Sequence, residues 1–164
     1  MLRPLTRRLP LFLAVFASFV LPLRASAQDV RVTVVTILAS DKPGEVNPKL
    51  KDLAQEVRKV EPNLSAFRLG KTGHRNVTVG QKEAIKLFDN KDYSTDVTVL
   101  AKDDTKKRVT IEVKPPMAGA IAYETSYNKF FPIVTRAVVD GERLIIAYSV
   151  KPAEKTAPAP PGGR

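Results

Sequence analysis

Residues 30–39 read VRVTVVTILA, a run rich in β-branched and aliphatic side chains. Such residues favour an extended backbone, because two heavy atoms on Cβ restrict the side-chain rotamers. In an extended chain the apolar residues of this run occupy both alternating faces: Val30, Val32, Val34 and Leu38 on one, and Val35, Ile37 and Ala39 on the other. A strand with two apolar faces has to be covered on both sides. The run therefore predicts a central strand in a layered β protein.

An amphipathic helix is predicted directly after this strand. Asn47 is a suitable N-cap, and Pro48 fits the first helical position. Apolar residues then recur every three or four positions until Pro62, which cannot continue a helix. They are Leu50, Leu53, Ala54, Val57 and Val60. We expect this apolar side of the helix to pack on the sheet.

After Pro62 the apolar residues alternate with a period of two, which is typical of strands. The expected strands span residues 65–71, 76–79, 83–88, 96–101, 108–114, 120–127, 133–139 and 143–150, and the last is apolar on both faces like the first. Asp103-Asp104 and Asp140-Gly141 separate apolar runs and predict hairpins. The expected fold class is α+β and mainly antiparallel β, a sandwich-like or curved sheet of about eight or nine strands with one helix after the first strand.

Within residues 120–127, alternation places Tyr123 and Tyr127 on one strand face together with Ile121 and Thr125. Exposed rings in such a row are able to stack on a sugar or a nucleobase. The pattern is, however, that of a strand at the edge of a core. We therefore predict that these side chains pack inside the domain.

The first 27 residues have the three parts of a secretory signal peptide. Three arginines form a basic start (Arg3, Arg7 and Arg8), residues 9–23 are almost wholly apolar, and Ala25-Ser26-Ala27 is a small-residue cleavage site. The apolar run is shorter than the roughly 20 residues that a membrane-spanning helix needs. We expect cleavage before Gln28, secretion across the inner membrane to a periplasmic or extracellular location, and no membrane span after cleavage.

The remaining chain is expected to hold one β-rich globular domain, residues 28–151, and a Pro/Ala-rich tail, residues 152–164. The tail reads PAEKTAPAPPGGR and has no large apolar residue, so it is predicted to be disordered. The chain has no cysteine and one histidine. This composition excludes a disulfide framework, a thiolate nucleophile, an iron–sulfur cluster and a multi-histidine metal site. We expect a monomer that needs no metal or cofactor.

No assembled catalytic set is predicted. Gly70-Lys71-Thr72 resembles the end of a phosphate-binding loop, but Ser65 stands where that motif needs glycine, and a turn is expected here instead. His74 is the only conventional general base, and no serine lies in a Gly-x-Ser-x-Gly elbow. The acidic run of Asp89, Asp92 and Asp96 lacks the glycine and the closing glutamate of a calcium loop.

The basic residues are concentrated in the middle of the chain. Without Arg24 and the three arginines of the basic start, the formal net charge falls from +10 to +6. The candidate residues for an anionic partner are Arg68, Lys71, Arg75, Lys82 and Lys86. Brought together, they would form a positive patch for an anionic envelope polymer. The absence of interleaved aromatic residues argues against specific nucleic-acid binding, and the alternative is that these side chains only keep strand surfaces in solution.

Several short motifs together resemble those of small exported bacterial β-rich domains of uncharacterised function. They are Ile37-Leu38-Ala39-Ser40, Phe67-Arg68-Leu69-Gly70-Lys71, Lys114-Pro115-Pro116, Lys129-Phe130-Phe131-Pro132 and the closing residues 141–147. The resemblance implies a secreted β-rich module of a bacterium. We expect an exported non-catalytic binding or structural module whose partner is an anionic envelope polymer or another exported protein. The alternative is a secreted hydrolase that acts on an envelope polymer through carboxylates and His74.

Overall fold

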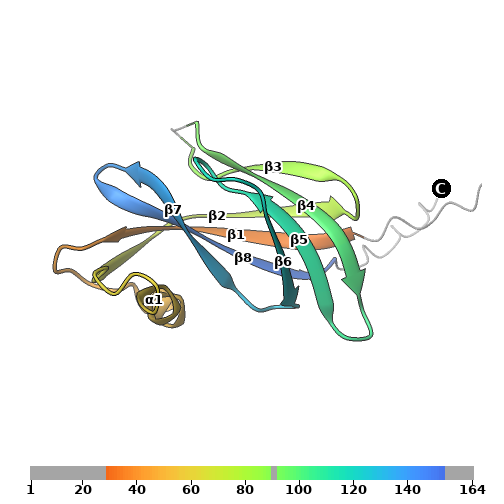
Figure 1. Ribbon diagram of the computed structural model, residues 1–164, viewed down its shortest axis with the longest axis horizontal. Coiled ribbons are helices and arrows are strands. Elements are labelled where there is room, and N and C mark those ends of the chain that lie inside the picture. Colours follow the sequence, from red (N-terminus) through yellow and green to blue (C-terminus); the bar gives the residue numbers. More distant parts are fainter. Residues whose placement is uncertain (1–28, 90–91, 154–164) are drawn as a thin grey trace, which may run out of the picture.

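The computed structural model describes residues 29–89 and 92–153, which form two four-stranded antiparallel sheets and one short α-helix (Figure 1). The expected signal segment 1–27 and residues 154–164 of the expected tail lie outside the described residues. The fold class predicted from the sequence is confirmed: a mainly antiparallel, sandwich-like α+β fold with its helix after the first strand.

The first sheet has the strand order β2-β1-β8-β7. Strand β1 (Asp29–Ser40) pairs with β2 (Ala66–Thr78) on one side and with β8 (Glu142–Pro152) on the other. Strand β7 (Phe131–Val139) completes the sheet beside β8. The two strands with apolar residues on both faces are therefore the central ones, as their sequences predict.

The second sheet is a meander in the order β3 (Lys82–Lys86), β4 (Ser94–Asp103), β5 (Arg108–Lys114) and β6 (Ile121–Ser126). Both expected hairpins are present, between β4 and β5 and between β7 and β8. In the second hairpin Asp140 and Gly141 both have positive φ, 55° and 81°. Such a turn matches the twist of the strands it joins, and Asp and Gly tolerate it.

The sequence-based prediction of a turn around Gly73 is wrong, because β2 continues through it as one strand. Glycine is needed here because neighbouring atoms lie close to the β2 backbone, and not because the chain turns. A Cβ on Gly70 would lie 3.1 Å from the Thr36 carbonyl oxygen, and a Cβ on Gly73 would lie 3.2 Å from Cγ2 of Ile85. The β1–β2 register shifts opposite Thr36, where β2 carries an extra residue. A bulge thus replaces the expected turn.

The core has two layers that share β1. Its inner face, including Val32, Val34 and Leu38, faces the second sheet. Its outer face, including Val35 and Ile37, packs under the 3-10 turn η1 (Pro48–Leu50) and helix α1 (Lys51–Arg58). The predicted cap is confirmed by geometry, since the Lys49 backbone N–H donates to Oδ1 of Asn47 at 3.0 Å.

Two buried threonines link the sheets through polar contacts. The Tyr148 hydroxyl of β8 lies 2.7 Å from Oγ1 of Thr95 on β4, and Thr95 donates to the Lys114 carbonyl at 3.2 Å. Thr36 of β1 donates to the Leu87 carbonyl at 3.2 Å. We call the first group the Tyr148–Thr95–Lys114 link. Within the described residues, no buried side-chain nitrogen or oxygen lacks a hydrogen-bond partner.

The predicted packing of the aromatic row on β6 is only partly correct. Thr125 is buried and Tyr127 packs against the inner core. Ile121 and Tyr123, in contrast, are 39% and 42% exposed. The reason is that β6 ends its sheet, so these side chains have a neighbouring strand on one side only.

Candidate functional site

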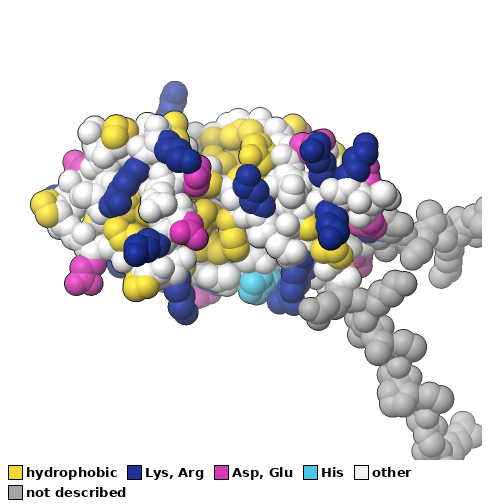
Figure 2. All heavy atoms as spheres, turned by 90° about the horizontal axis from the view of Figure 1, so that it is seen from below, with side chains coloured by type: hydrophobic (Ala, Val, Ile, Leu, Met, Phe, Trp, Pro, Cys, Tyr) yellow, Lys and Arg dark blue, Asp and Glu magenta, His cyan; other side chains and the backbone are white. Residues whose placement is uncertain are grey.

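A groove of about 680 Å³ lies on the outer face of the first sheet beside α1. Its floor comes from Val35 of β1 and Leu69 of β2, one wall from Leu53 of α1, and the opposite wall from Phe130. Figure 2 shows this side of the molecule, with hydrophobic side chains exposed in the hollow beside the helix. Phe130 is 39% exposed, so part of its ring is open to solvent at the groove. We call this site the α1 groove.

The wall that carries Phe130 is a short connection from β6 to β7, and backbone hydrogen bonds fix it. The Asn128 N–H donates to the Val150 carbonyl at 2.8 Å, and the Tyr127 N–H donates to the Lys107 carbonyl at 3.0 Å. Asn128 has a φ of 64°, a left-handed conformation that asparagine adopts more readily than most residues. The connection therefore holds the Phe130 backbone in place across from the helix.

Polar groups surround the apolar floor. They are Lys49, Asp52, Gln55 and Glu56 on the helix side, and Thr72, Asn128 and Lys129 on the other. Glu56 forms an ion pair with Lys59, with 2.6 Å between Oε1 of Glu56 and Nζ of Lys59. Lys49, Asp52 and Lys129 form no ion pair with any residue in the described part of the chain. The rim thus offers both signs of charge to a bound molecule.

The five basic residues that the sequence nominates lie on neighbouring strands, three on β2 and two on β3. Three of them are already paired with acids. Arg68 pairs with Glu142, Lys71 with Asp89, and Lys82 with Asp96 at 3.3 Å. The hydrogen bond from Glu142 also raises the pKa of Arg68.

Arg75 and Lys86 are the two nominated residues without an ion pair to another described residue. Both are exposed. Glu142 was not part of the sequence argument, because it is 74 positions from Arg68 in the chain. The positive charge of this surface is therefore smaller than the sequence suggests.

His74 lies on β2, where its Nδ1 is 3.0 Å from Oγ1 of Thr33. No carboxylate in the described part of the chain makes a hydrogen bond or ion pair with it. Among residues 29–89 and 92–153, no group of three or more His, Asp or Glu side chains is placed to hold a metal ion. Within the described residues, the groups that a hydrolytic site would need are not brought together around His74.

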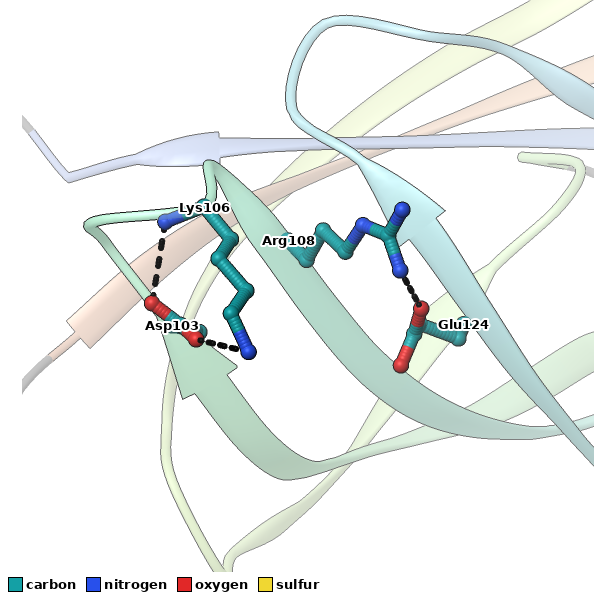
Figure 3. A network of polar contacts seen from close by, with 4 residues as sticks. All are labelled: Asp103, Lys106, Arg108 and Glu124. Atoms are coloured by element: carbon teal, nitrogen blue, oxygen red, sulfur yellow. Dashed lines mark hydrogen bonds and ion pairs between the residues drawn. The ribbon is translucent and has the colours of Figure 1, made fainter.

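The adjacent acids Asp103 and Asp104 organise the β4–β5 hairpin. Asp103 accepts from the Lys106 backbone N–H at 2.9 Å, beside the Arg108–Glu124 ion pair at 2.8 Å (Figure 3). Asp104 accepts from the Tyr127 hydroxyl at 2.7 Å. These bonds give both carboxylates a structural role.

The Asp104–Tyr127 hydrogen bond changes the titration of both partners. This bond, together with Lys102 at 2.9 Å, lowers the pKa of Asp104. Burial, and then the same hydrogen bond, raise the pKa of Tyr127. The pair therefore ties the hairpin to the β6–β7 connection that carries Phe130.

Comparison with known proteins gives no match to a protein-family model, a curated protein or a solved structure. In the described ranges, no helix is long and apolar enough to cross a membrane. Among the surfaces described above, the α1 groove is the hollow with the largest volume.

Proposed function

We propose that this protein is an exported, non-catalytic binding module whose ligand occupies the α1 groove. The observation that carries the proposal is the groove itself, about 680 Å³ with an apolar floor and a polar rim. Sites for small ligands are typically hollows of roughly 300–1,000 Å³, mostly apolar and with a few polar groups that set orientation. The α1 groove has this size and this lining.

The groove is built on rigid parts of the fold. Its floor residue Val35 is on a central strand, and Leu50 at its helix wall is only 2% exposed. A site on ordered strands and a packed helix needs little rearrangement when a ligand binds. The ligand that fits has an apolar body with polar groups that reach Lys49 and Asp52 at one rim or Lys129 at the other.

The groove is a better candidate than the basic surface. Of the five nominated basic residues, only Arg75 and Lys86 are without an acidic partner among the described residues. No observation around His74 favours the hydrolase alternative. Binding of an anionic polymer to β2 and β3 is retained as a secondary prediction, tested by elution from an immobilised polyanion across a salt series with Arg75→Glu and Lys86→Glu combined.

Export is supported by the basic start, the apolar run and the cleavage motif of residues 1–27. N-terminal sequencing of the protein recovered outside the inner membrane should begin at Gln28. A retained Met1 in the membrane fraction would contradict this part of the proposal.

Binding in the groove is testable with anilinonaphthalene sulfonate, a fluorescent probe with an apolar body and one anionic group. Thr72→Trp places a large side chain in the groove and should weaken probe binding about tenfold, equivalent to about 1.4 kcal/mol. Asn76→Trp is the matched control, because it makes a similar change on the same face of β2 outside the groove lining. Equal binding by both variants and the wild type would refute the groove as a ligand site.

A further inference from the structure

The two sheets have four edge strands, and three of them carry features that discourage pairing with another chain. Strand β3 has only five residues and carries Lys82 and Lys86. Strand β7 has Pro132 and a break in its register with β8. Strand β2 contains the bulge opposite Thr36 and approaches β3 through Gly73. Short length, lysine, proline and bulges are the usual means of protecting a sheet edge.

Strand β6 has six residues, one more than β3, but it lacks the lysine, proline and bulge of the other edges. It contains no proline and no lysine, and its register with β5 runs without a break from Arg108 opposite Ser126 to Val113 opposite Ile121. On its other side no strand of the described residues pairs with it. Residues 121–125 make no backbone hydrogen bond in the described part of the chain except those with β5. Their outward N–H and C=O groups are therefore available to another strand.

Two large apolar side chains of β6 are partly exposed at this edge. Ile121 and Tyr123 are 39% and 42% exposed, with Ala122 between them. The Tyr123 ring is held in place, since it stacks on Phe131 at a centroid distance of 4.3 Å, and Phe131 stacks in turn on buried Tyr148 at 5.5 Å. A fixed, half-exposed aromatic ring loses little entropy when a partner covers it.

We propose that β6 is a self-association edge, through which two copies of this chain pair antiparallel and join their second sheets into one continuous sheet. A two-fold axis at Tyr123 places Tyr123 opposite Tyr123 of the second copy and Ile121 opposite Thr125. The only charge on β6 is Glu124, which already pairs with Arg108 at 2.8 Å. In this register Glu124 faces Ala122, so no like charges oppose each other.

A second copy fits this edge better than a charged partner would, because the edge offers main-chain hydrogen bonds and apolar area rather than charge. Symmetric pairing also gives each copy the same new contacts and closes the assembly at two chains. The sequence alone predicts a monomer, whereas the exposed β6 edge favours a dimer. The proposal is independent of the α1 groove.

The first test is sedimentation of the purified full chain across a wide range of protein concentration. We expect a concentration-dependent monomer–dimer equilibrium. Ile121→Lys should weaken it about tenfold or more, since lysine on an edge opposes pairing. Leu100→Lys is the control, because Leu100 has a similar exposure of 45% but lies on the interior strand β4. Circular dichroism confirms that each variant is folded.

The second test uses the absence of cysteine from the chain. Directly opposed residues in an antiparallel pair have Cβ atoms about 4.5–5.5 Å apart, close to disulfide geometry. Tyr123→Cys should therefore form a disulfide-linked dimer on mild oxidation, and Leu100→Cys should not. Cross-linking at Ala122→Cys or Glu124→Cys instead supports the same edge in a shifted register.

Three results would overturn the proposal. They are a monomer at every concentration, a dimer that Leu100→Lys weakens as much as Ile121→Lys does, and cross-linking through Leu100→Cys alone. None of these results bears on the α1 groove, because Ile121→Lys is expected to bind anilinonaphthalene sulfonate as the wild type does. The failure of one proposal is thus distinguishable from the failure of the other.

Discussion

The Tyr148–Thr95–Lys114 link predicts that one core substitution will be partly rescued by a second. Thr95 donates to the Lys114 carbonyl, so its oxygen is left to accept from the Tyr148 hydroxyl. Tyr148→Phe removes one donor and leaves no buried polar atom without a partner. It should lower the free energy of unfolding by about 1 kcal/mol, the usual net value of one hydrogen bond.

Thr95→Val should cost more, about 2–3 kcal/mol, because it leaves the Tyr148 hydroxyl buried without an acceptor and removes the bond to Lys114. In the Thr95→Val background, Tyr148→Phe removes the stranded hydroxyl. The second substitution should therefore raise the stability of the first by about 1 kcal/mol. If the two substitutions acted independently, Tyr148→Phe would instead lower the stability of Thr95→Val by about 1 kcal/mol.

The burial of Tyr148 in this link also makes the stability of the fold depend on pH in alkaline solution. Burial raises the pKa of Tyr148, and its hydrogen bond with Thr95 opposes this only in part. A raised pKa means that the folded state keeps the phenol proton after the unfolded state has lost it. This contribution to stability is complete below the unfolded pKa of about 10 and is lost as the pH rises above it. Tyr148→Phe should lose less stability than the wild type over that range.

Urea unfolding followed by circular dichroism measures all four proteins of this cycle, near neutral pH and again above pH about 10. The wild type and the single variants provide the reference, and equal slopes with urea show that the denatured states are comparable. A further loss of stability when Tyr148→Phe is added to Thr95→Val would refute the reasoning, because it would show that the ring hydroxyl has another partner.

Three further predictions concern the fold. Ile146→Asp places a carboxylate in the inner core at a fully buried position, and calorimetry should show no cooperative unfolding transition. Gly70→Ala brings a Cβ to 3.1 Å from the Thr36 carbonyl oxygen and should cost about 1–2 kcal/mol in urea unfolding; an unchanged midpoint would mean that the bulge moves freely. Because the Asp104 pKa is lowered by Tyr127, Asp104→Asn should be less stable than the wild type above pH about 4, and the two should converge below it in thermal unfolding.

Local patterns in the sequence were sufficient for most of the fold. The two apolar faces of residues 30–39 identified β1 as central, and the cap at Asn47 identified the start of the helical region. The sequence does not predict β2 as one uninterrupted strand, because glycine, present at positions 70 and 73, is common in turns. Their real role depends on neighbours, Thr36 and Ile85, that only the folded chain brings close.

The sites were less predictable, because they join residues that are distant in the chain. The α1 groove combines Leu53 and Val35 with Phe130, and no spacing rule connects the three. Charge counting overstated the basic surface for the same reason, since Glu142 reaches Arg68 from another strand. Periodicity likewise does not distinguish a core strand from an edge strand, so the exposure of Tyr123 follows only from the strand order.

The buried hydroxyl of Thr36 helps to set the register of the central strand β1. Because β1 is apolar on both faces, a slip by one residue would still bury aliphatic side chains on each side, and hydrophobicity alone discriminates weakly between the two alignments. The Thr36 hydroxyl distinguishes the two alignments, because only the native one lets it donate to the Leu87 carbonyl on the inner side. In the slipped alignment it would face the aliphatic layer under α1. A single buried hydroxyl group thus favours one register of the central strand over the other, and with it the alignment of both core layers.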